Sequence, residues 1–303
     1  MTWRQKVTAE DLKAGVARIL WGLFKKLVVA DTVSMQVDAV YADPSSQSGP
    51  ALVVATILFG IQIYCDFSAY SDIAIGSARL FGVNLMENFR SPYLSTSISE
   101  FWRRWHISLS TWLRDYVYVP LGGNRTARSR WYFNIMVTFF LSGLWHGANW
   151  TFVVWGALHG LAIVIERMIG WPATASGAHG LGGKILVGVR WLTTLTLVMC
   201  AWAFFRADSL GDAMTVFGGM GSGWSHLSTA SIMAGVPADR VGIGFAMFLA
   251  VFAIEALWCE RADIGSRIAG VNLVVRWSAM LMLLFGVIML GTFGSEAFIY
   301  FQF

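Results

Sequence analysis

Long runs of apolar residues fill much of the chain after residue 130. They cover residues 131–150, 152–169, 186–205, 241–258 and 274–293, and a further run begins at residue 51. An α-helix needs about 20 mostly apolar residues to cross the hydrocarbon core of a bilayer, and these runs approach that length. The pattern therefore predicts an all-α, polytopic membrane protein with several spanning helices.

Residues 8–42 follow a different pattern, in which charged and apolar residues are mixed. Thr8 and Asp11 have the spacing of a helix-capping box, with Asp in place of the usual Glu. The charges favour an interfacial amphipathic helix over a spanning one, and they are Lys13, Arg18, Lys25 and Lys26. We expect one membrane domain over residues 1–303, with an interfacial helix and loop in residues 1–50 and the membrane core in residues 51–303.

Residues 97–118 predict a second amphipathic helix, which begins at a capping box of Ser97 and Glu100. One side is apolar and consists of Ile98, Phe101, Trp102, Trp105, Leu109, Trp112, Leu113 and Tyr116. The opposite side is polar and consists of Ser99, Arg103, His106, Ser110 and Arg114. Such a helix suits the membrane surface. Its polar stripe equally suits the wall of a water-filled cavity, as in a re-entrant segment, and both interpretations stay open.

The composition agrees with a membrane protein. Hydrophobic residues make up 56% of the chain and charged residues 13%, whereas a soluble domain carries about 25% charged residues. The net charge of +4 therefore reflects loop residues and gives no sign of nucleic-acid binding. Basic residues gather in every second loop between the predicted spans. These loops share one side of the membrane, and their charge predicts that this side is the cytoplasmic one. The basic residues are Arg125, Arg128, Arg130, Arg167, Lys184, Arg190, Arg261, Arg267 and Arg276.

His146 stands near the end of the 131–150 run, between Gly143 and Gly147. A titratable side chain in an apolar segment is costly, which makes it a candidate for function, and an imidazole exchanges a proton near neutral pH. If the run is one helix, His146 lies about 22 Å from Trp131, toward the outer side of the membrane. The alternative is a histidine that only bonds a neighbouring helix, and taken alone the residue leaves both open.

Asp66 and Asp72 fall at membrane depth or close to it in the run that begins at residue 51. Buried carboxylates need partners, and we favour pairing with arginines of the next stretch over a chemical role. In a different functional class, these carboxylates would line the solute path of a transporter, but the chain has no internal repeat of the kind many transporters show. The histidines lack ligand spacing and pair with no cysteine, so we expect no metal site, and His159, His179 and His226 are interpreted as packed or loop histidines.

Two motifs resemble those of a known family. Residues 101–116 (FWRRWHISLSTWLRDY) and 141–147 (LSGLWHG) are similar to the membrane-bound O-acyltransferase (MBOAT) family, in its bacterial, alginate O-acetyltransferase-like branch. Further segments resemble the same branch, namely residues 22–31 (GLFKKLVVAD), 64–72 (YCDFSAYSD), 204–207 (FFRA) and 298–303 (FIYFQF). The motifs follow one another over nearly the whole chain. Proteins of this branch carry further N-terminal helices, which we expect this chain to lack.

The resemblance implies transfer of an acyl group, most simply acetyl, onto a hydroxyl of an exported, alginate-like polysaccharide. His146 corresponds to the catalytic histidine of the family and His106 to the second histidine of its polysaccharide-modifying branch. A histidine base suits this chemistry, because general base catalysis contributes typically about 10²–10⁴-fold. Other polar residues are expected to support or line the cavity, and they are Asp66, Asp72, Arg103, Arg114, Asp115 and Asn149.

The resemblance also implies the molecules around the reaction. No bound cofactor is expected, and the acyl donor would be acetyl-CoA or an acyl carrier protein. The expected partners are the lipid bilayer, a polysaccharide acceptor and periplasmic acetyltransferases, at the bacterial inner membrane. A teichoic-acid-like polymer or a lipid is the alternative acceptor.

Overall fold

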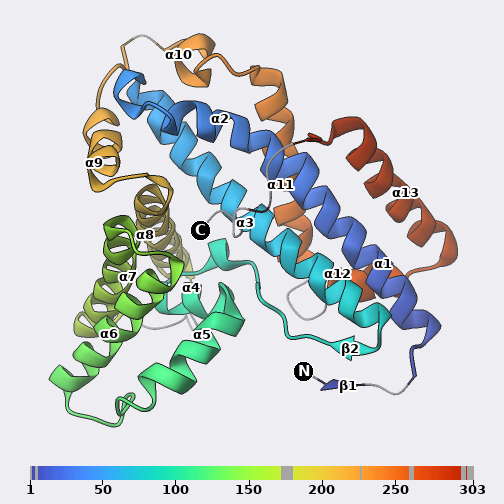
Figure 1. The fold of residues 1–303 in the computed structure, drawn as a ribbon, viewed down its shortest axis with the longest axis horizontal. Coiled ribbons are helices and arrows are strands. Elements are labelled where there is room, and N and C mark those ends of the chain that lie inside the picture. Colours follow the sequence, from blue (N-terminus) through green and yellow to red (C-terminus); the bar gives the residue numbers. More distant parts are fainter. Residues whose placement is uncertain are drawn as a thin grey trace. The chain divides into compact units, whose positions relative to one another are not determined.

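The structure, a computed structural model, describes residues 2–3, 6–171, 180–225, 227–258, 263–294 and 298, and it is predominantly helical (Figure 1). Within these residues, five helices are long and apolar enough to cross a membrane: Gly49–Leu80, Trp150–Met168, Gly180–Arg206, Ala238–Leu257 and Leu273–Leu290. The prediction of an all-α, polytopic membrane protein is confirmed.

The chain forms two compact units. Unit 1 contains Met1–Arg90 and Ser222–Phe303, and unit 2 contains Ser91–Gly221. Each unit packs around its own buried side chains, such as Phe59 in unit 1 and Trp155 in unit 2. The expectation of one membrane domain over residues 1–303 stays a prediction.

Unit 1 is built around the long helix α3. Its elements are β1 (Thr2–Trp3), α1 (Ala9–Phe24), the π-helix η1 (Lys25–Ala30), α2 (Asp31–Tyr41), η2 (Pro44–Ser46), α3 (Gly49–Leu80), β2 (Val83–Asn84), α10 (Thr229–Met233), α11 (Ala238–Trp258), α12 (Ile264–Gly270) and α13 (Leu273–Leu290). β1 and β2 pair in an antiparallel ribbon. α1 begins at the predicted capping box, since the Thr8 hydroxyl accepts from the Asp11 N–H and Asp11 accepts from the Thr8 N–H.

The helices α1 and α3 approach closely because glycines lie between them. A Cβ added to Gly15 would lie 2.9 Å from the carbonyl oxygen of Gly76, and one added to Gly22 would lie 2.8 Å from that of Ala69. Small residues permit this close approach of helix backbones in membrane proteins. The contact brings the charged residues of α1 and η1 against α3.

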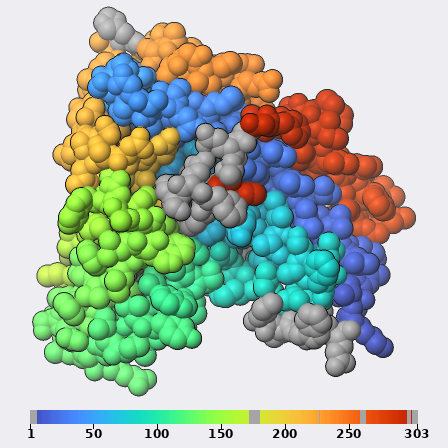
Figure 2. Space-filling model, in the orientation of Figure 1, coloured from blue at the N-terminus to red at the C-terminus, as the bar shows by residue number. Residues whose placement is uncertain are grey.

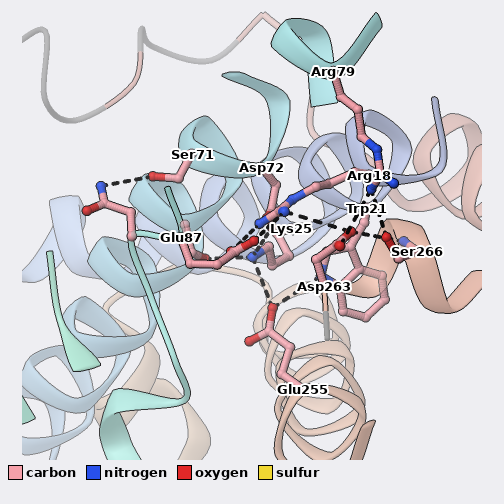
Figure 3. A network of polar contacts seen from close by, with 12 residues as sticks. Arg18, Trp21, Lys25, Ser71, Asp72, Arg79, Glu87, Glu255, Asp263 and Ser266 are labelled. Carbon is pink, nitrogen blue, oxygen red and sulfur yellow. Dashed lines mark hydrogen bonds and ion pairs between the residues drawn. The ribbon is translucent and has the colours of Figure 1, made fainter. Parts of the chain in front are cut away.

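These charged side chains lie inside unit 1. Arg18, Lys25 and Lys26 expose only 5%, 1% and 8% of their surface. The Arg18 Nε donates to Asp72 at 2.9 Å, and the Lys25 Nζ lies 2.6 Å from the same carboxylate (Figure 3). The Lys26 Nζ lies 2.7 Å from Asp66. An interfacial amphipathic helix would turn these charges to water, whereas the structure turns them toward α3, where carboxylates offset the cost of burial.

The pairing of Asp66 and Asp72 is confirmed, but the partners that we expected are wrong. We expected arginines of the stretch that follows α3 as their partners. The structure supplies cations from the preceding helices, which are Arg18, Lys25 and Lys26. The periodicity of one segment cannot show which earlier segment packs against it.

Glu255 of α11 completes this network, and no sequence pattern marked it. Its Oε1 accepts hydrogen bonds from the Lys25 Nζ at 3.0 Å and the Trp21 Nε1 at 3.1 Å (Figure 3). Its Oε2 accepts one from the Tyr64 hydroxyl. Three donors satisfy this buried carboxylate, as burial of a charge requires. The network therefore ties α1, η1, α3 and α11 together.

α13 lies on the outside of unit 1, beside α1. Figure 2 shows it in red along the margin of the unit. Its exposed side chains are large and apolar, and they include Leu273, Val274, Trp277, Met282 and Phe285. A helix that is apolar on its outer face suits contact with lipid.

Unit 2 carries both histidines of the predicted site. Its elements are η3 (Pro92–Leu94), α4 (Ile98–Arg104), α5 (Ile107–Leu113), the π-helix η4 (Arg114–Tyr118), α6 (Arg128–His146), α7 (Trp150–Met168), α8 (Gly180–Arg206) and α9 (Leu210–Gly219). α6 and α7 form an antiparallel hairpin, and they lie side by side in Figure 1. A Cβ added to Gly143 would strike the carbonyl oxygen of Phe152, and one added to Gly156 would strike that of Phe139.

Residues 97–118 do not form the single helix that the sequence predicts. α4 ends at Arg104, and His106 takes a left-handed backbone conformation with φ 44° before α5 begins. A residue in this conformation cannot continue a right-handed helix. The Ser97 cap is confirmed, because its hydroxyl accepts the Glu100 N–H at 3.0 Å. The Glu100 carboxylate, however, accepts from the Thr96 N–H.

Candidate active site

A polar stripe on α6 faces the interior of unit 2. Every fourth residue of the helix is polar, and all four side chains are buried: Asn134, Thr138, Ser142 and His146. Residues four apart lie on one face of an α-helix. This stripe explains why α6 is not among the helices apolar enough to span a membrane, although the sequence analysis counted residues 131–150 as a span.

His146 is the last residue of α6 and is 6% exposed. Aromatic rings surround its imidazole, with ring centroids 5.0 Å away at Trp145, 5.1 Å at Trp155 and 5.0 Å at Phe205. The helix stops because Gly147 adopts φ 155°, and a Cβ there would lie 2.9 Å from the Phe152 ring. Glycine at position 147 therefore lets the chain turn while the imidazole stays packed.

His106 lies at the break between α4 and α5 and is 8% exposed. The Ser108 hydroxyl lies 3.3 Å from its Nδ1. The left-handed backbone at His106 interrupts the chain between the end of α4 and the start of α5, and the side chain at this break is buried. Strained backbone of this kind persists where the surrounding structure holds it.

The two histidines come together around one tryptophan. The Trp145 ring centroid lies 5.9 Å from that of His106 and 5.0 Å from that of His146. Burial and, to a smaller extent, the nearby imidazole of His146 together lower the pKa of His106 to about 3. His106 is therefore neutral near pH 7, and a neutral imidazole can accept a proton or a hydrogen bond. The juxtaposition of the residues is observed, and their catalytic role stays a prediction.

The other predicted site residues are spread over the protein. Arg114 and Asp115 pair with each other at 2.7 Å on the surface. Asn149 caps α7, since its side chain accepts the Thr151 N–H at 3.1 Å, and it donates to the Asp208 carbonyl at 3.0 Å. Arg103 is exposed and lines a separate pocket of unit 2, whereas Asp66 and Asp72 belong to the ion-pair network of unit 1.

The aromatic side chains that surround the His146 ring were not predicted from the sequence. Trp155 of α7 and Phe205 of α8 both contact the His146 ring. The Trp155 indole N–H has no hydrogen-bond partner within the described part of the chain, so it can donate to a bound oxygen. Periodicity placed both residues in spans but gave no reason to prefer them over other aromatic residues.

His159 is a packed histidine, as the sequence analysis proposed. Its ring is 2% exposed and stacks on Phe101 with a centroid distance of 6.0 Å. His179 and His226 lie outside the described residues. Within the described ranges, no group of three or more His, Cys, Asp or Glu side chains is arranged to hold a metal ion.

The comparison with known families agrees with this geometry. The family model of the membrane-bound O-acyltransferases matches residues 3–172, which is more than half of the chain. The protein belongs to the MBOAT family. The family predicted from the sequence motifs is therefore confirmed, and the MBOAT match includes both His106 and His146.

Named relatives refine the comparison. A probable alginate O-acetylase of Pseudomonas putida is 36% identical over 98% of this chain and 62% of its own length. A peptidoglycan O-acetyltransferase of Helicobacter pylori is 39% identical over 74% of this chain and 42% of its own length. A teichoic acid D-alanyltransferase of Streptococcus thermophilus is 34% identical over 51% of this chain and 40% of its own length. The chain thus spans about half the length of the curated relatives it matches.

Proposed function

We propose that the protein transfers an acyl group, most simply acetyl, onto a hydroxyl of an exported, alginate-like polysaccharide. The observation that carries this proposal is the meeting of His106 and His146 at Trp145, in a chain of the MBOAT family. The names of the relatives from Pseudomonas putida and Helicobacter pylori support acetyl as the group and a cell-envelope polymer as the acceptor.

His146 is the proposed general base. It takes the proton of the acceptor hydroxyl while that oxygen forms a bond to the acyl carbonyl carbon of a thioester donor, such as acetyl-CoA or an acyl carrier protein. The carbon–sulfur bond then breaks, and the departing thiolate receives a proton from the imidazolium. A positioned base contributes about 10²–10⁴-fold to such a reaction. In this proposal, the Trp155 N–H donates a hydrogen bond to the substrate oxygen, and His106 holds that oxygen or relays a proton.

The same proposal includes the location of the protein, its partner proteins and the alternative acceptors. The protein is a multi-pass membrane protein, and we propose the bacterial inner membrane as its location and periplasmic acetyltransferases as its partners. Peptidoglycan and a teichoic-acid-like polymer are the alternative acceptors, because relatives with these names match the chain. A lipid acceptor is a further alternative.

Ester-linked acetate on exopolysaccharide tests the proposal. A strain that lacks its own alginate O-acetylase would receive the 303-residue chain, its His146→Ala variant or its His159→Phe variant, with a full-length relative as positive control. We expect the chain to restore acetate and His146→Ala to lose at least about 10²-fold at equal membrane abundance. His159→Phe is the matched control, because its ring only packs against other rings such as Phe101.

Three results that differ from the expected one would each contradict a part of the proposal. Normal acetylation by His146→Ala would exclude this histidine as the base. An equal loss in both histidine variants would mean that packing, and not proton transfer, explains the effect. If the full-length relative restores acetate and the chain does not, the proposed activity fails for the 303-residue chain on its own.

A further inference from the structure

Unit 2 contains a second pocket, at the opposite end of the α6–α7 hairpin from His146. Its volume is about 700 Å³, which lies within the usual range of ligand pockets of about 300–1,000 Å³. The N-terminal part of α6 contributes Arg128 and Trp131, and the C-terminal part of α7 contributes Ile163, Glu166 and Arg167. Trp131 lies about 22 Å from His146 along the helix, so this pocket is separate from the histidine site.

Positive charge dominates the lining. Three arginines reach the pocket from three helices, Arg103 from α4, Arg128 from α6 and Arg167 from α7. Within the described ranges, Arg128 and Arg167 form no ion pair with a carboxylate. Like charges repel one another, and a bound anion would relieve that repulsion.

Among the described residues, Glu166 is the one carboxylate in the lining, and it is already hydrogen-bonded. Glu166 accepts the N–H of Ile98 at 2.5 Å and the N–H of Ser99 at 3.2 Å, and its Oε2 also accepts the Ser99 hydroxyl at 2.9 Å. These donors, at the start of α4, stabilise its negative charge. Glu166 therefore fixes α4 to α7, and Arg128 and Arg167 stay available to a ligand.

The walls of the pocket are held in place by contacts of their own. The Trp131 Nε1 donates to the Tyr118 hydroxyl at 2.7 Å, and the Trp171 Nε1 donates to the Thr96 carbonyl at 3.0 Å. The buried guanidinium of Arg190 stacks over the Trp171 ring at 5.3 Å. Two indoles of the lining are therefore held in place before any ligand binds.

We propose that this basic pocket binds a phosphate-bearing group. Guanidinium groups bind phosphate through paired, charge-assisted hydrogen bonds, and the hydroxyl and amide side chains of Ser99, Asn124 and Thr126 add donors. Basic pockets between membrane helices on the cytoplasmic side bind anionic lipid headgroups, and the loop charges predict that side here. A soluble phosphate ester offers the same chemistry.

The surroundings favour the headgroup of a lipid as the source of the phosphate. Apolar side chains next to Arg167 point outward, and they are Ile165, Met168 and Ile169. They make the side of α7 that faces away from the pocket apolar, which suits contact with acyl chains. Trp131 and Trp171 suit the headgroup level of a membrane, where tryptophan is enriched.

Thermal unfolding of the purified 303-residue chain in a neutral detergent tests the proposal. The probes are dioctanoyl phosphatidylglycerol, dioctanoyl phosphatidylcholine, coenzyme A and inorganic phosphate. A ligand that binds only the folded protein raises the melting temperature in a saturable manner. We expect saturation with phosphatidylglycerol, if a lipid is the source, or with coenzyme A or phosphate, if the source is soluble.

The arginine variants identify the site. We expect the apparent affinity to fall at least about tenfold in the double variant Arg128→Gln, Arg167→Gln, because two charge-assisted contacts are lost. Arg125→Gln is the matched control, since Arg125 is exposed on the same loop and does not line the pocket. Each single variant, with its melting temperature in the absence of ligand, separates lost binding from lost folding.

Three results would overturn the proposal. One is the absence of a saturable shift with phosphatidylglycerol, coenzyme A and phosphate alike. Another is a shift of equal size with phosphatidylcholine, which would reflect a general effect of amphiphiles. The third is an unchanged affinity in the double variant. None of these measurements depends on acyl transfer, so their failure is distinguishable from a failure of the proposed function.

Discussion

A left-handed backbone is unusual for a residue other than glycine, and His106 holds one at φ 44° while its ring is buried. Asparagine tolerates this conformation, whereas a β-branched residue does not. We predict that His106→Val lowers the free energy of unfolding by about 1–3 kcal/mol and that His106→Asn lowers it less. Thermal unfolding in detergent near neutral pH measures both. An equal loss in the two variants would show that the ring, not the backbone, sets the cost.

The wild type and the His106→Asn variant also give a prediction for the pH dependence of stability. Burial holds the pKa of His106 at about 3 in the folded protein, whereas an unfolded histidine has a pKa of about 6.5. Between these values the unfolded chain binds a proton that the folded protein does not, so stability falls as the pH falls below about 6.5. The melting temperature of the wild type should therefore drop more than that of His106→Asn between about pH 7 and about pH 5. Parallel curves would mean that His106 is not buried in its neutral form.

At the scale of elements, the α6–α7 hairpin depends on glycines that permit backbone contact. A methyl group at position 156 would strike the Phe139 carbonyl oxygen, so we predict that Gly156→Ala lowers the free energy of unfolding by about 1–3 kcal/mol. Gly182→Ala in α8 is the matched control, because a Cβ at position 182 meets nothing within 4 Å. Thermal unfolding again provides the measurement. A Gly156→Ala variant as stable as Gly182→Ala would contradict the close approach of the two helices.

Most elements could be predicted from the sequence because each spanning run is apolar over its own length. The break at His106 could not be, since the apolar and polar residues keep a helical period straight through it. The buried stripe of α6 was also hidden, because Asn134 and Thr138 look like interruptions of a span until a neighbouring helix covers them. Local patterns specify local structure, and the partner of each face is decided by tertiary packing.

Within each unit, the partners of charged residues could not be predicted from local sequence patterns either. Both histidines of the candidate site were found from their motifs, and unit 2 brings them together at Trp145. In unit 1, Lys25 is 1% exposed and pairs with Asp72 and Glu255, which lie far from it along the chain. From the sequence, a lysine in a charged segment is expected to be exposed on the surface. Only the fold shows that carboxylates from α3 and α11 accompany it into the interior.

The charge difference between the two ends of the α6–α7 hairpin predicts how this part of the molecule crosses the membrane. Arg125 stands before α6, and Ala148 lies in the turn after His146; both residues are exposed. α6 rises about 28 Å over its length, close to the roughly 30 Å of a bilayer core. The polar residues that lower its apolar content are buried inside unit 2, so they do not prevent it from crossing the membrane beside the apolar helix α7. In a chain whose cysteines Cys65, Cys200 and Cys259 are replaced, we predict that an impermeant maleimide labels Ala148→Cys in intact spheroplasts. Arg125→Cys should react only after the membrane is permeabilised, because basic loops remain in the cytoplasm. The reverse labelling would place His146 on the cytoplasmic side, where an exported polymer could not reach it, and the proposed acceptor would have to be abandoned.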